Sequence, residues 1–153
     1  RYIHLLAGYV AAVSFALVTI VWVKKMLPEE GDRVWLMHMG GYLGGKGHYP
    51  AGKFNAGQKI LFWAALAMMI VLVVTGLIMG LSSGHRFAWQ SVLYTIHDIA
   101  GLGMILLLLG HVYLGVCVNP HSVRTIFGGI VSSVWAKRHH PNWEPVADLP
   151  DPD

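Results

Sequence analysis

Three long apolar segments restrict this chain to folds that suit a lipid bilayer. They cover residues 3–23, 60–81 and about 96–118, and each reaches the roughly 20 residues that a transmembrane helix needs. Because lipid offers no hydrogen-bond partners to an exposed backbone, each segment must be helical. The sequence therefore predicts an all-α membrane protein in which residues 1–153 form a single membrane domain with three transmembrane helices.

The composition supports this class of protein. Hydrophobic residues make up 55% of the 153 residues and charged residues only 12%, whereas soluble domains are roughly 25% charged. A soluble domain of this size leaves about a third of its surface in water, so it could not hide this much apolar surface. The balance argues against a disordered chain, a nucleic-acid-binding module and an ordinary soluble enzyme.

The positions of lysine and arginine predict how the helices are oriented. The loop 24–59 contains six of the 11 Lys and Arg residues, whereas the short segment 82–95 contains Arg86 alone. Because cytoplasmic loops are enriched in these residues, we expect the loop 24–59 and the tail 119–153 to be cytoplasmic. The chain would then be a multi-pass protein of the cytoplasmic (inner) membrane with a cytoplasmic C-terminus. The loop is also rich in glycine between residues 40 and 57, for which the sequence offers no functional reason.

Three of the nine histidines, His4, His97 and His111, lie inside or at the edge of the apolar segments. Ionisable residues in a membrane are costly and are candidates for function, although a neutral histidine bonded to a nearby carbonyl group is the alternative. His97 and His111 are 14 residues apart, so they share one helix face at a separation of about 21 Å. They can therefore serve two different sites, one near each membrane surface.

His4 and His97 each begin a segment that runs inward, so both are expected at the outer level. Two neutral imidazoles that face each other across two helices form a bis-histidine haem site. The single cysteine, Cys117, excludes both covalent c-type attachment and the usual zinc sites. The iron ligands predicted in this chain are thus His4, His97 and His111.

Each of these histidines has a glycine four residues later: Gly8, Gly101 and Gly115. Residues i and i+4 lie on one helix face, so a glycine there leaves room for a flat macrocycle beside its ligand. Chance among 18 glycines and close helix packing are the alternatives. We favour packing alone for Gly76 and Gly80.

His111 needs a second ligand at the inner level, and the apolar segments offer no histidine there. We expect that ligand from another helix, either in an additional span before Arg1 or in an adjacent subunit. The remaining six histidines are expected to be peripheral, with His139 and His140 on a solvated basic surface.

Several motifs resemble the cytochrome b (gamma) subunit of respiratory formate dehydrogenase. They are residues 52–59, the run His111-Val112-Tyr113 fourteen residues after His97, the tail segment 135–143, and residues 1–25, which resemble the second helix of that family. The similarity covers essentially the whole chain. Related hydrogenase and thiosulfate-reductase cytochromes share the helix bundle but match the segments around Asn55 and His139 less well.

The resemblance implies a four-helix di-haem cytochrome b bundle, of which this sequence shows three helices. It implies that His4 and His97 ligate the outer of two b haems and that His111 is one ligand of the inner haem. The other inner ligand lies on the first helix of the family, which has no counterpart here. It also implies a menaquinone or other quinone near Asn55 and Gln58, whose amides can bond a carbonyl group without placing charge in lipid. Helix capping by Asn55 is the alternative.

We therefore expect an electron-transfer and quinone-reducing subunit without catalytic side chains of its own. Its expected partners are an iron–sulfur beta subunit, a molybdenum or tungsten alpha subunit that oxidises formate, membrane lipid and quinone, but no nucleic acid. A higher oligomer of the complex is compatible with this view. The alternatives are the same scaffold in a hydrogenase or another quinone-linked oxidoreductase, a haem-free transporter with a histidine relay, and a haem-free anchor for a peripheral enzyme.

Overall fold

The computed structural model describes residues 2–42, 49–82, 88–129 and 131–143, and these residues form helices, turns and loops without a β-strand. Lys46 and Arg86, both counted in the charge argument, and the tail from residue 144 lie outside the described residues. The contacts divide the chain into two compact units. The membrane-spanning unit comprises Arg1–Lys24 and Phe62–Leu109, and the loop-and-tail unit comprises Lys25–Leu61 and Gly110–Asp153.

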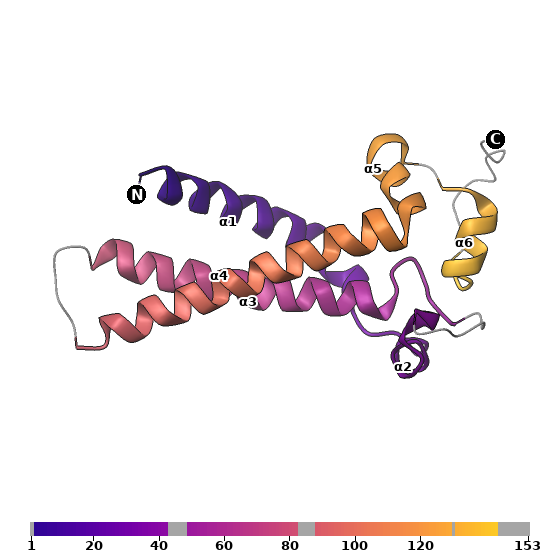
Figure 1. Cartoon of the computed structure of the whole chain (residues 1–153), viewed down its shortest axis with the longest axis horizontal. Helices are drawn as coiled ribbons and strands as arrows, with labels where there is room; N and C mark the ends of the chain where they lie inside the picture. The colour runs from indigo at the N-terminus through magenta and orange to yellow at the C-terminus, as the bar shows by residue number, and fades with distance from the viewer. Residues whose placement is uncertain (1, 43–48, 83–87, 130, 144–153) are drawn as a thin grey trace. The chain divides into compact units, whose positions relative to one another are not determined.

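Three long helices account for the three apolar segments (Figure 1). They are α1 (Tyr2–Trp22), α3 (Ala56–Leu81) and α4 (Gln90–Tyr113). With their short continuations they give the candidate membrane spans Tyr2–Met26, Ala56–Leu81 and Gln90–Val118. The predicted all-α fold with three membrane-spanning helices is therefore confirmed. Both α3 and α4 begin several residues before the apolar segments, because their first turns are polar.

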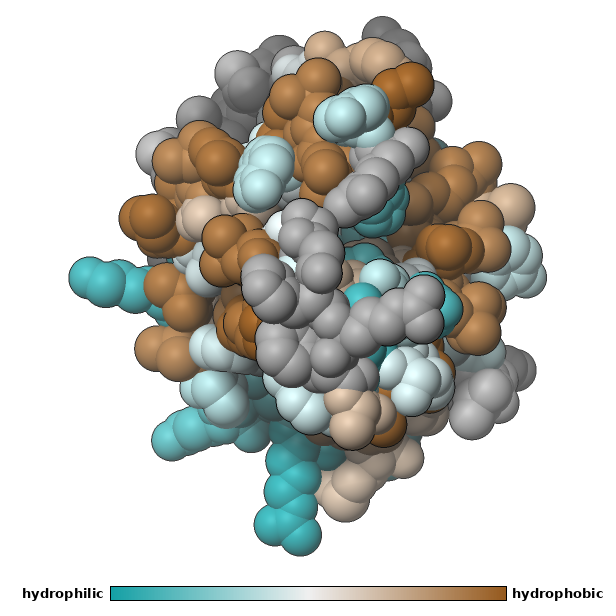
Figure 2. Space-filling model, turned by 90° about the vertical axis from the view of Figure 1, so that its left-hand side faces the viewer, coloured by the Kyte–Doolittle hydropathy of each residue, from teal (hydrophilic) through white to brown (hydrophobic). Residues whose placement is uncertain are grey.

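The long helices leave large apolar side chains on their outer surfaces. No residue of α1 is buried, and Ala100 is the one buried residue within α4. Apolar atoms cover much of the surface seen in Figure 2. In water this exposure would cost about 25 cal/mol for each Å², whereas in a bilayer these side chains contact acyl chains. The pattern is that of helices surrounded by lipid.

Small residues allow α4 to approach α3 in the membrane-spanning unit. A Cβ atom added at Gly103 would lie 3.2 Å from Met68 Sδ, and one at Gly101 would lie 3.9 Å from Leu72 Cδ2. Close contact through glycine is typical of helix pairs in membranes, where dispersion replaces the hydrophobic effect as the source of packing energy.

The core of the loop-and-tail unit forms around Trp35 of the short helix α2 (Asp32–Met37). Ala51 and Ala56 are buried against its indole ring, and Tyr49 packs beside them. A Cβ atom at Gly57 would lie 2.8 Å from the ring, and one at Gly40 would overlap it. The glycine content of the loop thus has a structural reason, since two of these glycines allow the backbone to lie directly on the tryptophan.

A buried cation joins the start of α2 to the start of α3. Lys59 is 4% exposed, and its Nζ lies 3.0 and 2.9 Å from the two carboxylate oxygens of Asp32. The exposed Glu29 adds an oxygen at 3.2 Å. Because a buried ammonium group needs charged or polar partners, this cluster fixes α2 against the first turn of α3.

The tail binds to the loop through backbone and side-chain hydrogen bonds. The N–H of Asn142 donates to the carbonyl of Ala51 at 3.0 Å, and His140 Nδ1 donates to the carbonyl of Gly52 at 2.8 Å. The predicted solvated position of His140 is wrong, because the side chain is 5% exposed and its ring contacts Trp135 and Trp143. The neighbouring His139, at the end of α6 (Ser133–His139), stacks on Trp135 and is half-buried.

Gly40→Ala should destabilise the loop-and-tail unit. Gly40 has a φ of 59°, a conformation that costs other residues about 1–2 kcal/mol, and the added methyl group would also meet the ring of Trp35. We expect a lower thermal unfolding midpoint for the detergent-purified variant. Gly128→Ala is the control, since a Cβ atom there meets nothing within 4 Å. Equal midpoints for the two variants would contradict the structure of this core.

Acidification should weaken the attachment of the tail. Burial lowers the pKa of His140 below 6.5, the bond to Gly52 partly opposes this shift, and the charge of His139 adds to it. The unfolded chain therefore binds more protons than the folded chain just below pH 6.5, so stability falls as the pH falls from 6.5 toward the lowered pKa. Denaturant midpoints at pH 7.5, 6.5 and 5.5 measure this loss. His140→Asn should reduce the loss and His139→Gln should retain most of it; an unchanged loss in His140→Asn would exclude this origin.

Candidate functional site

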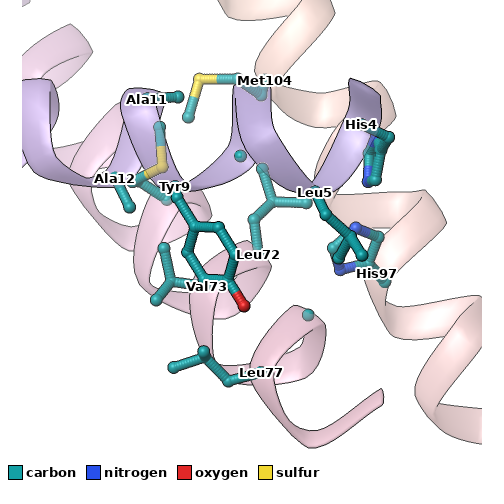
Figure 3. A pocket seen from close by; sticks show the side chains of 13 residues that line it. His4, Leu5, Tyr9, Ala11, Ala12, Leu72, Val73, Leu77, His97 and Met104 are labelled. Carbon is teal, nitrogen blue, oxygen red and sulfur yellow. The ribbon is translucent and has the colours of Figure 1, made fainter. Parts of the chain in front are cut away.

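A cavity of about 300 Å³ lies among α1, α3 and α4 of the membrane-spanning unit (Figure 3). Most of its lining is apolar, including Leu72, Val73 and Met104, and glycine occurs twice in its walls, at Gly8 and Gly76. Pockets that are mostly apolar with a few well-placed polar groups are typical of cofactor sites. The cavity is therefore the leading candidate site among the described residues.

His4 of α1 and His97 of α4 come together at this cavity, as the sequence predicts. Their ring centroids are 6.1 Å apart and their planes make an angle of 72°, and Figure 3 shows the two rings close together. Because imidazole nitrogens bind metal ions at about 2 Å, two rings that share one ion have centroids about 6 Å apart. The observed spacing therefore fits two histidines that would hold one metal ion.

Thr75 of α3 determines which nitrogen of His97 carries the proton. Its hydroxyl oxygen lies 2.6 Å from the carbonyl oxygen of Val71 and 2.7 Å from His97 Nδ1. A threonine hydroxyl has one proton, and the carbonyl of Val71 can only accept it. The hydroxyl oxygen then accepts a hydrogen bond from His97 Nδ1–H, so Nε2 carries the lone pair that a metal ion needs.

Sequence reasoning missed two residues of this site, Thr75 and Gly76. A Cβ atom at Gly76 would lie 3.5 Å from His97 Cε1. This glycine, for which the sequence pattern predicted a packing role alone, thus lies beside the ring of His97. Their signal in the sequence is weak: one hydroxyl residue next to a small residue within an uncharged span. Threonine and glycine are both common in membrane helices.

The three glycines predicted to make room for a macrocycle occupy different surroundings. Gly8 lines the cavity, and a Cβ atom there would meet nothing within 4 Å. Gly101 faces Leu72 of α3, while Gly115 belongs to the loop-and-tail unit, where its Cβ position lies 3.9 Å from Ser122 Oγ. The structure thus brings one of the three to the His4–His97 site.

His111 is an exposed residue in the last turn of α4 and belongs to the loop-and-tail unit. A short π-helical segment, η3 (Leu114–Val118), follows it. Within the described part of the chain it makes neither a hydrogen bond nor a ring contact. Its role as a haem ligand stays a prediction.

Asn55 and Gln58 form a reciprocal cap at the start of α3. The side-chain oxygen of Asn55 accepts the backbone N–H of Gln58, and the side-chain oxygen of Gln58 accepts the backbone N–H of Asn55, both at 2.9 Å. This is the arrangement of a capping box, so helix capping by Asn55, the alternative to quinone binding, is confirmed, and Gln58 also takes part in the cap. Among the described residues, the amide NH₂ groups make no further hydrogen bond, and their use in quinone binding stays a prediction.

Comparison with known proteins places these features in one family. A family described as prokaryotic cytochrome b561 matches residues 1–129. The nitrate-inducible formate dehydrogenase cytochrome b556(Fdn) subunit of Escherichia coli K12 is 36% identical over 148 residues, which cover 94% of this chain and 68% of that protein. The formate dehydrogenase cytochrome b556 subunit of Haemophilus influenzae is 32% identical, with coverages of 94% and 62%.

A third relative, the cytochrome b556(fdo) subunit of Escherichia coli K12 formate dehydrogenase, is 27% identical over 146 residues, with coverages of 94% and 69%. The resemblance found in the sequence motifs is confirmed by these matches, and the family implies haem b as the cofactor. With three membrane-spanning helices and a family match across most of its length, the chain belongs to the prokaryotic cytochrome b561 family, among the cytochrome b subunits of formate dehydrogenases.

Proposed function

We propose that this chain anchors a formate dehydrogenase complex in the membrane and carries electrons from an outer iron–sulfur subunit to quinone near the cytoplasmic side. The observation that carries the proposal is the pair of histidines, His4 and His97, whose ring centroids are 6.1 Å apart at an apolar cavity among three membrane-spanning helices. Formate oxidation would take place on a separate alpha subunit with molybdenum or tungsten. The names of the relatives support this assignment of partners, and a higher oligomer of the complex remains compatible with it.

The residues at the cavity suit a b haem. His4 and His97 would hold it, since their spacing matches two ligands on one iron and His97 presents an unprotonated Nε2. Leu72, Val73 and Met104 would exclude water from its faces. A bound b haem would supply a one-electron carrier within the membrane, while the side chains position and tune it. His111 is proposed as one ligand of a second b haem, whose other ligand would come from a further helix.

Asn55 and Gln58 are proposed as donors to a menaquinone or other quinone. Their capping bonds use the two side-chain oxygens and hold both side chains in place. Each amide therefore keeps an NH₂ group that can donate to a quinone carbonyl. Hydrogen bonds between amides and a carbonyl add no net charge, which suits a position at the edge of lipid.

The contacts between loop and tail support the proposed topology. Asn142 and His140 bond the backbone of residues 51 and 52, so the loop and the tail lie on the same side of the membrane. The loop has the highest number of Lys and Arg residues among the connections, and the positive-inside rule therefore favours the cytoplasmic side of the inner membrane for both. Protons for quinone reduction would come from that side.

His97→Ala should remove the outer haem. The substitution deletes a ligand and leaves His4 alone at the cavity, so we expect the haem b content of the purified complex to fall from two to one for each copy. The pyridine haemochrome assay measures this ratio. His121→Ala is the control, since His121 is exposed in the loop-and-tail unit. An unchanged ratio in His97→Ala would reject the site, and an absence of Soret absorption in the wild type would instead favour a histidine relay or a haem-free anchor.

Gln58→Glu should separate capping from quinone binding. Glutamate retains the oxygen that completes the capping box, so the thermal midpoint should stay close to that of the wild type. The variant loses its NH₂ donor, and loss of one neutral hydrogen bond corresponds to roughly a three- to tenfold rise in the apparent KM for a quinone analogue. Gln90→Glu, at the start of α4, is the matched control. Unchanged quinone kinetics in Gln58→Glu would leave Gln58 with a capping role alone.

A further inference from the structure

We propose that Thr75 is a positioning residue that holds His97 with its Nε2 turned toward the cavity and thereby sets the redox potential of the haem bound there. This inference rests on the proposed function of His4 and His97. It goes beyond that function because Thr75 is not a proposed ligand and would act through its hydrogen bond to His97. The geometry that supports it is a chain of two hydrogen bonds on one side of the His97 ring.

The chain of hydrogen bonds has one consistent direction. His97 Nδ1–H donates to Thr75 Oγ1, and the Thr75 hydroxyl donates to the carbonyl of Val71, four residues earlier on the same helix. Threonine side chains in helices commonly bond the i−4 carbonyl. The backbone of α3 therefore orients the Thr75 hydroxyl without any contribution from His97. The lone pairs of Oγ1 remain for His97, which selects the tautomer with a proton on Nδ1.

The surroundings of Thr75 make this bond hard to replace. Thr75 is 5% exposed and lies next in sequence to Gly76, which lines the apolar cavity. A buried N–H without an acceptor costs about 1–3 kcal/mol, and in an apolar wall no water takes over the role. The absence of a side chain on Gly76 lets the His97 ring lie against α3, since its Cβ position is only 3.5 Å from Cε1.

His4 differs from His97 in this respect. His4 lies on the exposed helix α1, and within the described residues it contacts the His97 ring but makes no hydrogen bond. One ligand of the pair is thus oriented in advance by a third helix, while the other is free to adjust. A hydrogen bond from the far nitrogen also makes an imidazole a stronger electron donor to a metal ion. Thr75 would therefore favour the oxidised form of the haem through His97.

The test compares three variants in the assembled complex. Thr75→Val replaces the hydroxyl group with a methyl group of similar shape, and Thr75→Ser keeps the hydroxyl group. Thr19→Val is the matched control, because the Thr19 hydroxyl donates to the i−4 carbonyl of Phe15 at 2.8 Å on α1 and, among the described residues, makes no hydrogen bond to a histidine. Haem b retention after detergent washing, a redox titration in membranes and the electron paramagnetic resonance spectrum of the oxidised haem are measured for each variant.

We expect Thr75→Val to shift the midpoint potential of one haem upward and to weaken haem retention about 10- to 100-fold. Thr75→Ser should restore both values, and Thr19→Val should match the wild type. Unchanged potential, spectrum and retention in Thr75→Val would overturn the proposal. Failure of the Thr75→Val polypeptide to accumulate would also overturn it, since Thr75 would then be a folding residue. A wild-type complex without haem would instead reject the proposed function itself.

Discussion

The hydrogen bond between His97 and Thr75 is the polar contact on which the cavity depends. In a hydrocarbon environment a polar side chain must find its partner within the protein, and here α3 provides one through a hydroxyl group that its own backbone already holds. The bond joins α4 to α3 and selects the tautomer of His97. Apolar side chains, together with Gly8 and Gly76, line the cavity at which the two rings meet.

The fold follows from the sequence wherever apolar length decides the structure. Lipid requires a helix for each long apolar segment, so the existence of α1, α3 and α4 could be predicted without any knowledge of packing. The helix ends could not, because they depend on polar residues. The start of α3 depends on a reciprocal cap by Asn55 and Gln58. The cap adds a polar first turn to the helix, and a prediction from hydropathy alone begins the helix after that turn. The fold of the loop depends on Trp35 and on its contacts with Gly40 and with the more distant Gly57.

The candidate site was predictable to the extent that it depends on helix register. His4 and His97 lie at the starts of two apolar segments that run in the same direction, so they were expected at one level, and the structure brings them together. Thr75 was not predictable, since a threonine in a membrane helix can satisfy its hydroxyl group on its own backbone and thus needs no other partner. His140 was misplaced for a related reason: its acceptor, the carbonyl of Gly52, is 88 residues away, and no local pattern indicates such a contact.

The hydrogen bonds between tail and loop also impose an order on biogenesis. A ribosome adds about 5–20 residues per second, so His140 emerges roughly 4 to 18 s after Gly52, which is 88 residues earlier. Throughout that interval α3 and α4 must enter the bilayer while the segment before α3 has no tail to bind. The Trp35 core and the Lys59 ion pairs are formed by residues made before α4, and they can hold this segment during the delay. The tail can bind the loop only after α3 and α4, which lie between them in sequence, are in the membrane.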